Sequence, residues 1–276
     1  MWPDWAPSGS HYLYSTDESG RTAIQDRSAK EGFTRVLLSA GSEVLPPSAT
    51  YLGEPRWAPD GHRFAFRLNF GGGTNLQVWV SNASGNHPFS IDPSADSAAF
   101  CWSPDGEWIA YIRFKDEKVQ LAKVRPTPGT SPIVLQDAAS IMRSQIHWSQ
   151  AGDWILYPSV DGLSLASPDG KSHRTLTTRK FTAYGFSKSG EQVIGVFQNT
   201  APDHAEWELY SVDVKTGAEK RLAALDLPPN VGEVAGFSLH PDGKRFATSI
   251  ARWPYDIWML EGFDQQKSWL DRLLRR

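Results

Sequence analysis

The 276-residue chain has very little cysteine and no excess of basic charge. Its one cysteine, Cys101, cannot form a disulfide within the chain, which leaves the redox compartment open. The 28 basic residues are outnumbered by 31 acidic ones and form no run, so nothing in the charge pattern indicates nucleic-acid binding. No apolar run approaches the roughly 20 residues that a membrane-spanning helix needs, and we expect no membrane span.

The start of the chain also lacks a recognisable targeting signal. Its first residues, Met-Trp-Pro-Asp-Trp, contain neither the basic nor the apolar region of a secretory signal. As encoded, the chain is therefore expected in the cytoplasm, or in the periplasm if it is part of a longer membrane-anchored protein. Its 40% hydrophobic content is sufficient for a sizeable core, which predicts a folded globular protein.

A short motif recurs along the whole chain. It is an anchor residue with glycine four positions later, and it is clearest in Trp57-Ala-Pro-Asp-Gly61 and Trp102-Ser-Pro-Asp-Gly106. The six anchors are Trp5, Trp57, Trp102, Trp148, Phe186 and Leu239. Their separations of 52, 45, 46, 38 and 53 residues are typical of propeller blades.

The residues around each anchor predict antiparallel strands. Pro-Asp-Gly between two alternating apolar runs is a hairpin signal, because Pro presets φ and Gly accepts a positive φ. Third and fourth strands follow in most units, so the sequence predicts an all-β fold, a six-bladed β-propeller of four-stranded antiparallel blades. The whole chain, 1–276, is expected to be a single domain with blades starting near 1, 53, 98, 144, 182 and 233. A short C-terminal helix or a fourth strand is expected at 265–276, and both alternatives remain open.

The repeat resembles that of a known family. Trp-Ser-Pro-Asp-Gly followed by an Ile-Ala-Tyr-like strand, as in 102–111 and 57–66, is similar to the WD-like (WD40-like) repeat of TolB-type six-bladed β-propellers. The ending 256–263 looks most like the C-terminal propeller regions of bacterial winged-helix regulators and kinases, although the chain contains no such upstream domain. The resemblance implies a partner-binding protein, with the sensor part of a longer bacterial regulator as one possibility.

Recognisable catalytic motifs are missing. The chain has no Gly-x-Ser-x-Gly elbow, so it lacks the hydrolase domain of prolyl-oligopeptidase relatives. Its seven histidines show neither His-x-His nor His-Glu-x-x-His spacing. We therefore expect no enzyme activity, no metal and no cofactor.

The sequence instead favours a monomeric binding module with a protein or peptide partner. The loops after the second strands, at 67–76, 113–118, 197–207 and 251–255, are expected to be long and diverse, and such loops carry recognition. The candidate binding residues are Arg67, Arg113, His147, Trp207, Arg252 and Trp253. The alternative is an enzyme, a hydrolase or lyase, with its site in the central channel. Its candidate groups are Asp4, Glu54, Asp96, His147 and Glu233.

Overall fold

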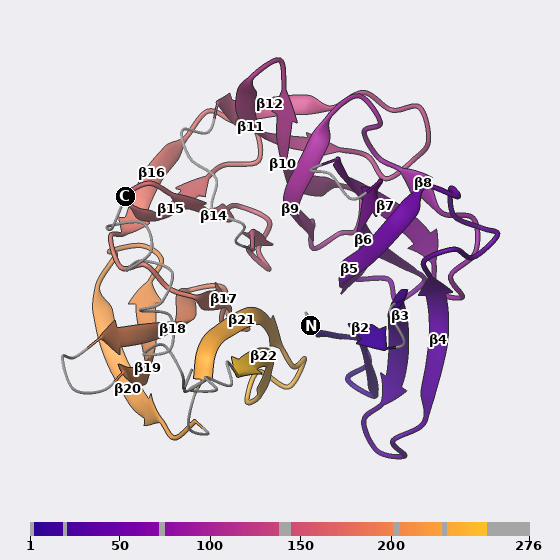
Figure 1. Cartoon of the computed structure of the whole chain (residues 1–276). Helices are drawn as coiled ribbons and strands as arrows, with labels where there is room; N and C mark the ends of the chain where they lie inside the picture. The colour runs from indigo at the N-terminus through magenta and orange to yellow at the C-terminus, as the bar shows by residue number, and fades with distance from the viewer. Residues whose placement is uncertain are drawn as a thin grey trace, which may run out of the picture.

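In the computed structural model, five four-stranded antiparallel sheets are arranged in a ring (Figure 1), and we call the region between their innermost strands the channel. The structure describes residues 3–18, 21–71, 75–137, 145–200, 205–227 and 231–252. The first two blades are β1 (Asp4–Trp5), β2 (His11–Glu18), β3 (Arg21–Ser28) and β4 (Thr34–Ser39), then β5 (Ala49–Trp57), β6 (Arg63–Phe70), β7 (Leu76–Asn82) and β8 (Phe89–Ser90). The third is β9 (Asp96–Trp102), β10 (Ile109–Lys115), β11 (Lys118–Val124) and β12 (Ile133–Asp137). The fourth and fifth are β13 (His147–Trp148), β14 (Ile155–Ser159), β15 (Gly162–Ala166) and β16 (His173–Thr177), then β17 (Ala183–Phe186), β18 (Gln192–Thr200), β19 (Ala205–Asp213) and β20 (Glu219–Leu225).

The sixth repeat differs from the other five. It forms a two-stranded sheet, β21 (Val231–Leu239) and β22 (Phe246–Arg252), so the prediction of six four-stranded blades is wrong for the described residues, which contain five. The expected helix or strand at 265–276 lies outside the described residues. The described part of the chain contains no helix, and hence none that could cross a bilayer.

The first and last repeats meet at the channel. The backbone N–H of Trp5 donates to Ser238 Oγ at 3.0 Å, and Ser238 Oγ donates to Asp4 Oδ1 at 2.8 Å. These residues lie on β1 and β21, so the ring closes through its innermost strands. Figure 1 shows the resulting order, from β2 on the right through β10 at the top to β21 below.

The predicted hairpin turns are confirmed. The six glycines that follow the anchors have φ between 68° and 80°. Each donates its N–H to the carbonyl three residues earlier, as Gly106 does to Ser103 at 2.9 Å. A side chain is strained at such a φ, which explains why the motif requires glycine there. The six positions are Gly9, Gly61, Gly106, Gly152, Gly190 and Gly243.

The connections between second and third strands are shorter than predicted. Strand β10 continues to Lys115, and only Asp116 and Glu117 join it to β11, with φ of 51° and 61°. Two consecutive positive φ values are typical of a tight hairpin turn. The prediction of a long loop at 113–118 is therefore wrong, because the strands pair almost to the turn.

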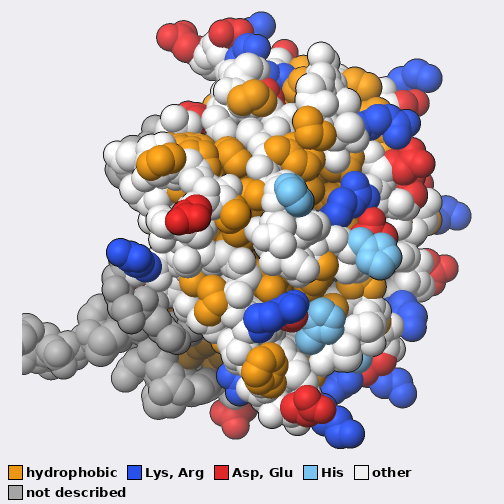
Figure 2. Space-filling view, turned by 90° about the vertical axis from the view of Figure 1, so that its right-hand side faces the viewer, with side chains coloured by type: hydrophobic (Ala, Val, Ile, Leu, Met, Phe, Trp, Pro, Cys, Tyr) orange, Lys and Arg blue, Asp and Glu red, His pale blue; other side chains and the backbone are white. Residues whose placement is uncertain are grey.

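The anchor tryptophans differ in burial, and Trp148 is only half-buried. Trp57 and Trp102 are buried, and the Trp102 indole N–H donates to the Arg56 carbonyl of the preceding blade at 3.1 Å. Exposed apolar side chains are scattered over several strands and connections, with Phe33 and Val36 among the most exposed. Figure 2, which looks onto the right-hand side of Figure 1, shows orange side chains interspersed with blue and red ones. Such scattered exposure is ordinary for a soluble surface.

Candidate functional site

A cavity of about 500 Å³ opens at the end of the channel where the Pro-Asp-Gly turns lie, and we call it the turn mouth. Every repeat contributes the same three positions to its lining. These are the residue before the anchor (Asp4, Arg56, Cys101, His147, Gly185 and Ser238), the anchor itself, and the residue two beyond it (Pro7, Pro59, Pro104, Gln150, Lys188 and Pro241). The pseudosymmetry of the chain thus builds a polar ring below a collar of Trp and Pro side chains.

The polar ring is tied together by bonds between blades. Asp4 Oδ2 accepts the Trp57 N–H at 2.8 Å, and Asp4 Oδ1 accepts from Arg56 Nη1 at 3.2 Å. Burial raises the pKa of the Asp4 carboxyl above its usual range, although the Arg56 charge and these hydrogen bonds oppose the shift. The backbone N–H of Trp148 makes the corresponding bond to Cys101. The residue before the anchor therefore links each of these blades to its neighbour.

Burial also governs the other two titratable groups of the ring. Burial, with the Arg56 charge as a second cause, lowers the pKa of His147 to about 3, so its imidazole is neutral near pH 7. His147 Nε2 is buried and has no hydrogen-bond partner among the described residues. Burial raises the pKa of the Cys101 thiol, which keeps it protonated and unreactive.

A second cavity, of about 860 Å³, lies between blade 1 and the β21–β22 sheet. Tyr12, Tyr14 and Glu233 line it, together with Glu54 and Arg67 of blade 2. Arg67 Nη2 lies 2.7 Å from Glu54 Oε1 in a largely buried ion pair. Arg67, predicted as a binding residue, thus reaches a cavity, but its guanidinium is already paired.

Arg113 has a structural environment. Its side chain is 6% exposed, and Nη2 lies 3.3 Å from Oδ2 of Asp92, which is 3% exposed. The Tyr111 hydroxyl donates to the same oxygen at 2.7 Å, and burial together with the Asp92 carboxylate raises the pKa of Tyr111. Arg113 was predicted as a binding residue at or just beyond the end of a second strand; it lies in β10, near the end of that strand, and pairs with a buried carboxylate.

The remaining predicted binding residues are not brought together. Trp207 was expected in an irregular loop, but it lies in β19 and packs against Val196, Val234 and Phe237 with 6% exposure. Arg252 ends β22, and the structure does not describe its side chain. Trp253 lies outside the described residues. His147 faces the turn mouth, whereas Arg67 lines the second cavity, so the six candidates form no single site.

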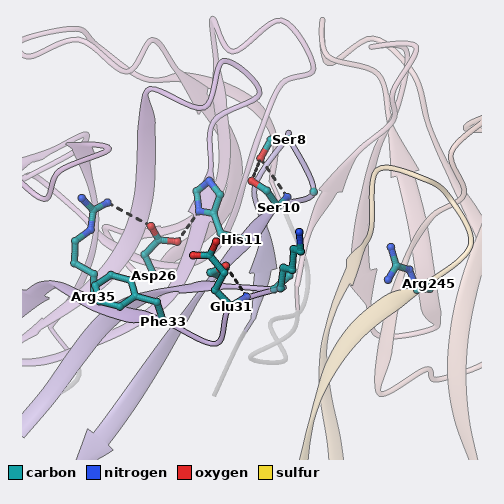
Figure 3. A pocket seen from close by; sticks show the side chains of 12 residues that line it. Ser8, Ser10, His11, Asp26, Glu31, Phe33, Arg35 and Arg245 are labelled. Carbon is teal, nitrogen blue, oxygen red and sulfur yellow. Dashed lines mark hydrogen bonds and ion pairs between the residues drawn. The ribbon is translucent and has the colours of Figure 1, made fainter.

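A third hollow lies between blade 1 and Arg245, which belongs to the connection between β21 and β22 (Figure 3). His11 Nδ1 lies 2.6 Å from Asp26 Oδ1, and Arg35 Nη2 lies 3.3 Å from Asp26 Oδ2. Arg245 stands across the hollow from these residues, and Phe33 lies beside Arg35. The arrangement is an exposed charge cluster around one carboxylate.

Arg56 is the residue that sequence reasoning missed. It precedes the anchor Trp57, and in four repeats this position holds a polar or charged side chain: Asp4, Arg56, His147 and Ser238. The alternation of an inner strand places this position opposite in phase to the buried anchor, so comparing it across the six repeats was the available signal.

Comparisons with known proteins support the fold. No family model and no curated protein matches the chain. TolB from Acinetobacter baumannii superposes with a TM-score of 0.61 at 17% identity, covering 82% of this chain and 54% of that one, so the chain spans about half its length. A TolB structure from Agrobacterium tumefaciens superposes with a TM-score of 0.63 at 18% identity, covering 92% of this chain and 90% of that one. Oligogalacturonate lyase from Vibrio parahaemolyticus superposes with a TM-score of 0.62 at 12% identity, covering 93% of this chain and 71% of that one.

At these identities the likeness concerns the fold alone. Binding proteins and enzymes share it, so it does not choose between them. The similarity to winged-helix regulators and kinases finds no support in these structures and stays a prediction. The chain has a TolB-like β-propeller fold.

Proposed function

We propose that the chain is a non-catalytic binding module whose propeller presents the face that carries the loops after the second strands, which we call the loop face, to a protein or peptide. One observation carries the proposal: the acidic side chains deepest in the channel and blades are each held by an arginine. Such pairs organise a rigid scaffold and leave few groups free for proton transfer. They are Asp4 with Arg56, Glu54 with Arg67, and Asp92 with Arg113.

The titration of the channel groups also favours binding over catalysis. A general acid or base works best with a pKa near the working pH. His147, with a pKa of about 3, is a weak base at neutral pH. Asp4 and Glu54 are engaged as described, which leaves Asp96 and Glu233 as the candidates of the enzyme alternative without an assigned arginine.

The proposal extends to the context of the chain. We infer that it is a monomeric sensor or interaction domain of a bacterial protein. The TolB-type resemblance supports this reading, since it implies partner binding.

We expect the partner to bind at the loop face. Once a partner is captured from a lysate with the purified chain, Arg252→Ala or Trp253→Ala should weaken its binding by about 1 kcal/mol or more, because Arg and Trp dominate interface energies. Titration calorimetry with each variant measures the effect. His62→Ala and Lys244→Ala, beside the Pro-Asp-Gly turns, are the matched controls and should be near neutral. The reverse pattern would move the partner to the turn face.

We expect only background turnover of ester, peptide, glycoside and oligogalacturonate substrates. Asp4 and Glu54 are paired with arginines and His147 is a weak base, so these three groups are poorly suited to proton transfer near neutral pH. Product release from each substrate, followed by chromatography, tests this. Turnover that disappears in His147→Ala or Glu54→Gln, in protein with unchanged circular dichroism, would establish the channel enzyme instead.

A further inference from the structure

The lining of the turn mouth contains more cationic side chains than carboxylates. Among its lining residues Arg56 and Lys188 are cationic, Asp4 is the one carboxylate, and His147 and His240 carry imidazoles, of which that of His147 is neutral near pH 7. Two aspartates of the neighbouring turns bond arginines: Asp60 bonds Arg63, and Asp242 bonds Arg245 while its Oδ1 lies 3.0 Å from His240 Nδ1. The mouth therefore has one positive charge more than it has negative.

Arg56 lies at the centre of this imbalance. Its charge acts on the titratable groups of Asp4, Cys101 and His147, which come from three other blades and line the same cavity. Asp4 engages one guanidinium nitrogen, Nη1, and no other Arg56 nitrogen has a hydrogen-bond acceptor among the described residues. These nitrogens are also not among the fully buried polar atoms without a partner. Arg56 thus has hydrogen-bond donors without an acceptor among the described residues, and its side chain lines an open cavity.

Asp4 cannot take up those donors, because its own oxygens are committed. Oδ1 accepts from Ser238 and from Arg56, and Oδ2 accepts from the Trp57 backbone. Asp4 therefore positions Arg56 through Nη1 and leaves the other guanidinium nitrogens without a carboxylate partner. A planar guanidinium with a free edge matches the two oxygens of a carboxylate.

The collar above Arg56 strengthens such an interaction. Trp5, Trp57, Trp102 and Trp148 line the mouth together with Pro7, Pro59, Pro104 and Pro241. These side chains offer water few hydrogen bonds, and a charged pair is stronger where water is limited. The volume of about 500 Å³ accommodates a small acid or one acidic side chain.

We propose that the turn mouth is a binding site for a carboxylate group, held by the free donors of Arg56 and attracted by Lys188 at the rim. The site is at the opposite end of the propeller from the loop face, and it stands independently of the proposed function. The carboxylate belongs to a small organic acid or to an acidic residue of a peptide, two sources with the same recognition chemistry.

The test titrates the whole chain with acetate, succinate and two blocked tripeptides, acetyl-Gly-Glu-Gly-amide and acetyl-Gly-Gln-Gly-amide, up to about 10 mM. Calorimetry should detect at least one carboxylate ligand, and the Gln peptide should bind at least about ten-fold more weakly than any Glu peptide that binds. Binding of the free acids assigns the site to small acids, and binding of the Glu peptide alone assigns it to a partner's acidic residue. Absence of binding by every carboxylate, or equal binding of the two peptides, overturns the proposal.

Variants locate the binding. Arg56→Gln should weaken the carboxylate ligand by about ten-fold or more, Arg56→Lys should retain part of the affinity, and Lys188→Gln should cost about two- to five-fold. Arg125→Gln, which removes an exposed arginine paired with Glu107, is the matched control and should leave binding unchanged. If Arg56→Gln does not fold, the proposal is tested by the affinity of Lys188→Gln for the carboxylate ligand and by the difference between the Glu and Gln peptides in binding to the wild-type chain. Unchanged affinity in folded Arg56→Gln, or in Lys188→Gln, would refute the site.

Discussion

Trp102→Ala should lower the free energy of unfolding by about 3–5 kcal/mol, a large part of the roughly 5–15 kcal/mol typical of a domain. The indole is 7% exposed, donates to the Arg56 carbonyl at 3.1 Å and lies under the Arg63 guanidinium, 5.1 Å from its ring centroid. Truncation therefore opens a cavity between blades 2 and 3 and leaves the Arg56 carbonyl without its donor. Urea denaturation followed by circular dichroism measures the loss.

Trp108→Ala is the matched control for this prediction. Trp108 is six residues along the same chain segment but is partly exposed, where Lys123 and Arg125 cover its ring. Its truncation should cost clearly less, about 1 kcal/mol. Equal losses for the two variants would mean that the anchor position has no special role between the blades.

The repeats predict much of the fold because the turn and the blade core obey local rules. Gly106 needs a positive φ and Trp102 needs a buried position, and both requirements are visible within five residues of sequence. The sixth repeat shows the limit of this reasoning. Its Leu239-His-Pro-Asp-Gly243 motif specifies a hairpin, which β21 and β22 form, but the motif carries no information about outer strands.

The candidate site was harder to predict, because its partners come from different blades. Asp4 and Arg56 are 52 residues apart, and no spacing rule links them before the ring is assembled. Arg113 was placed correctly at the end of a second strand, but its partner, Asp92, lies before the first strand of the same blade. The sequence alone shows that these charged residues exist but not which of them pair. An arginine such as Arg113, which is in a buried ion pair, could therefore be mistaken for a binding residue.

Asp92→Ala should destabilise the fold by about 3–5 kcal/mol, because it leaves the charge of Arg113 buried without a partner. Asp92 also accepts from the Tyr111 hydroxyl and, through Oδ1, from Ser94 Oγ at 2.8 Å. The change therefore removes several bonds from a nearly inaccessible carboxylate. Chemical denaturation of the variant, compared with the wild-type chain, measures the loss.

A double-mutant cycle separates the ion pair from the other bonds of Asp92. Arg113→Met removes the charge while keeping most of the side-chain volume, so the double variant Asp92→Ala/Arg113→Met should be more stable than the sum of the two single losses predicts. A structural pair thus shows coupling of about 0.5–3 kcal/mol. If the losses are additive, and Arg113→Met instead abolishes partner binding in a protein of unchanged stability, Arg113 is a recognition residue and the pairing seen here is incidental to its role.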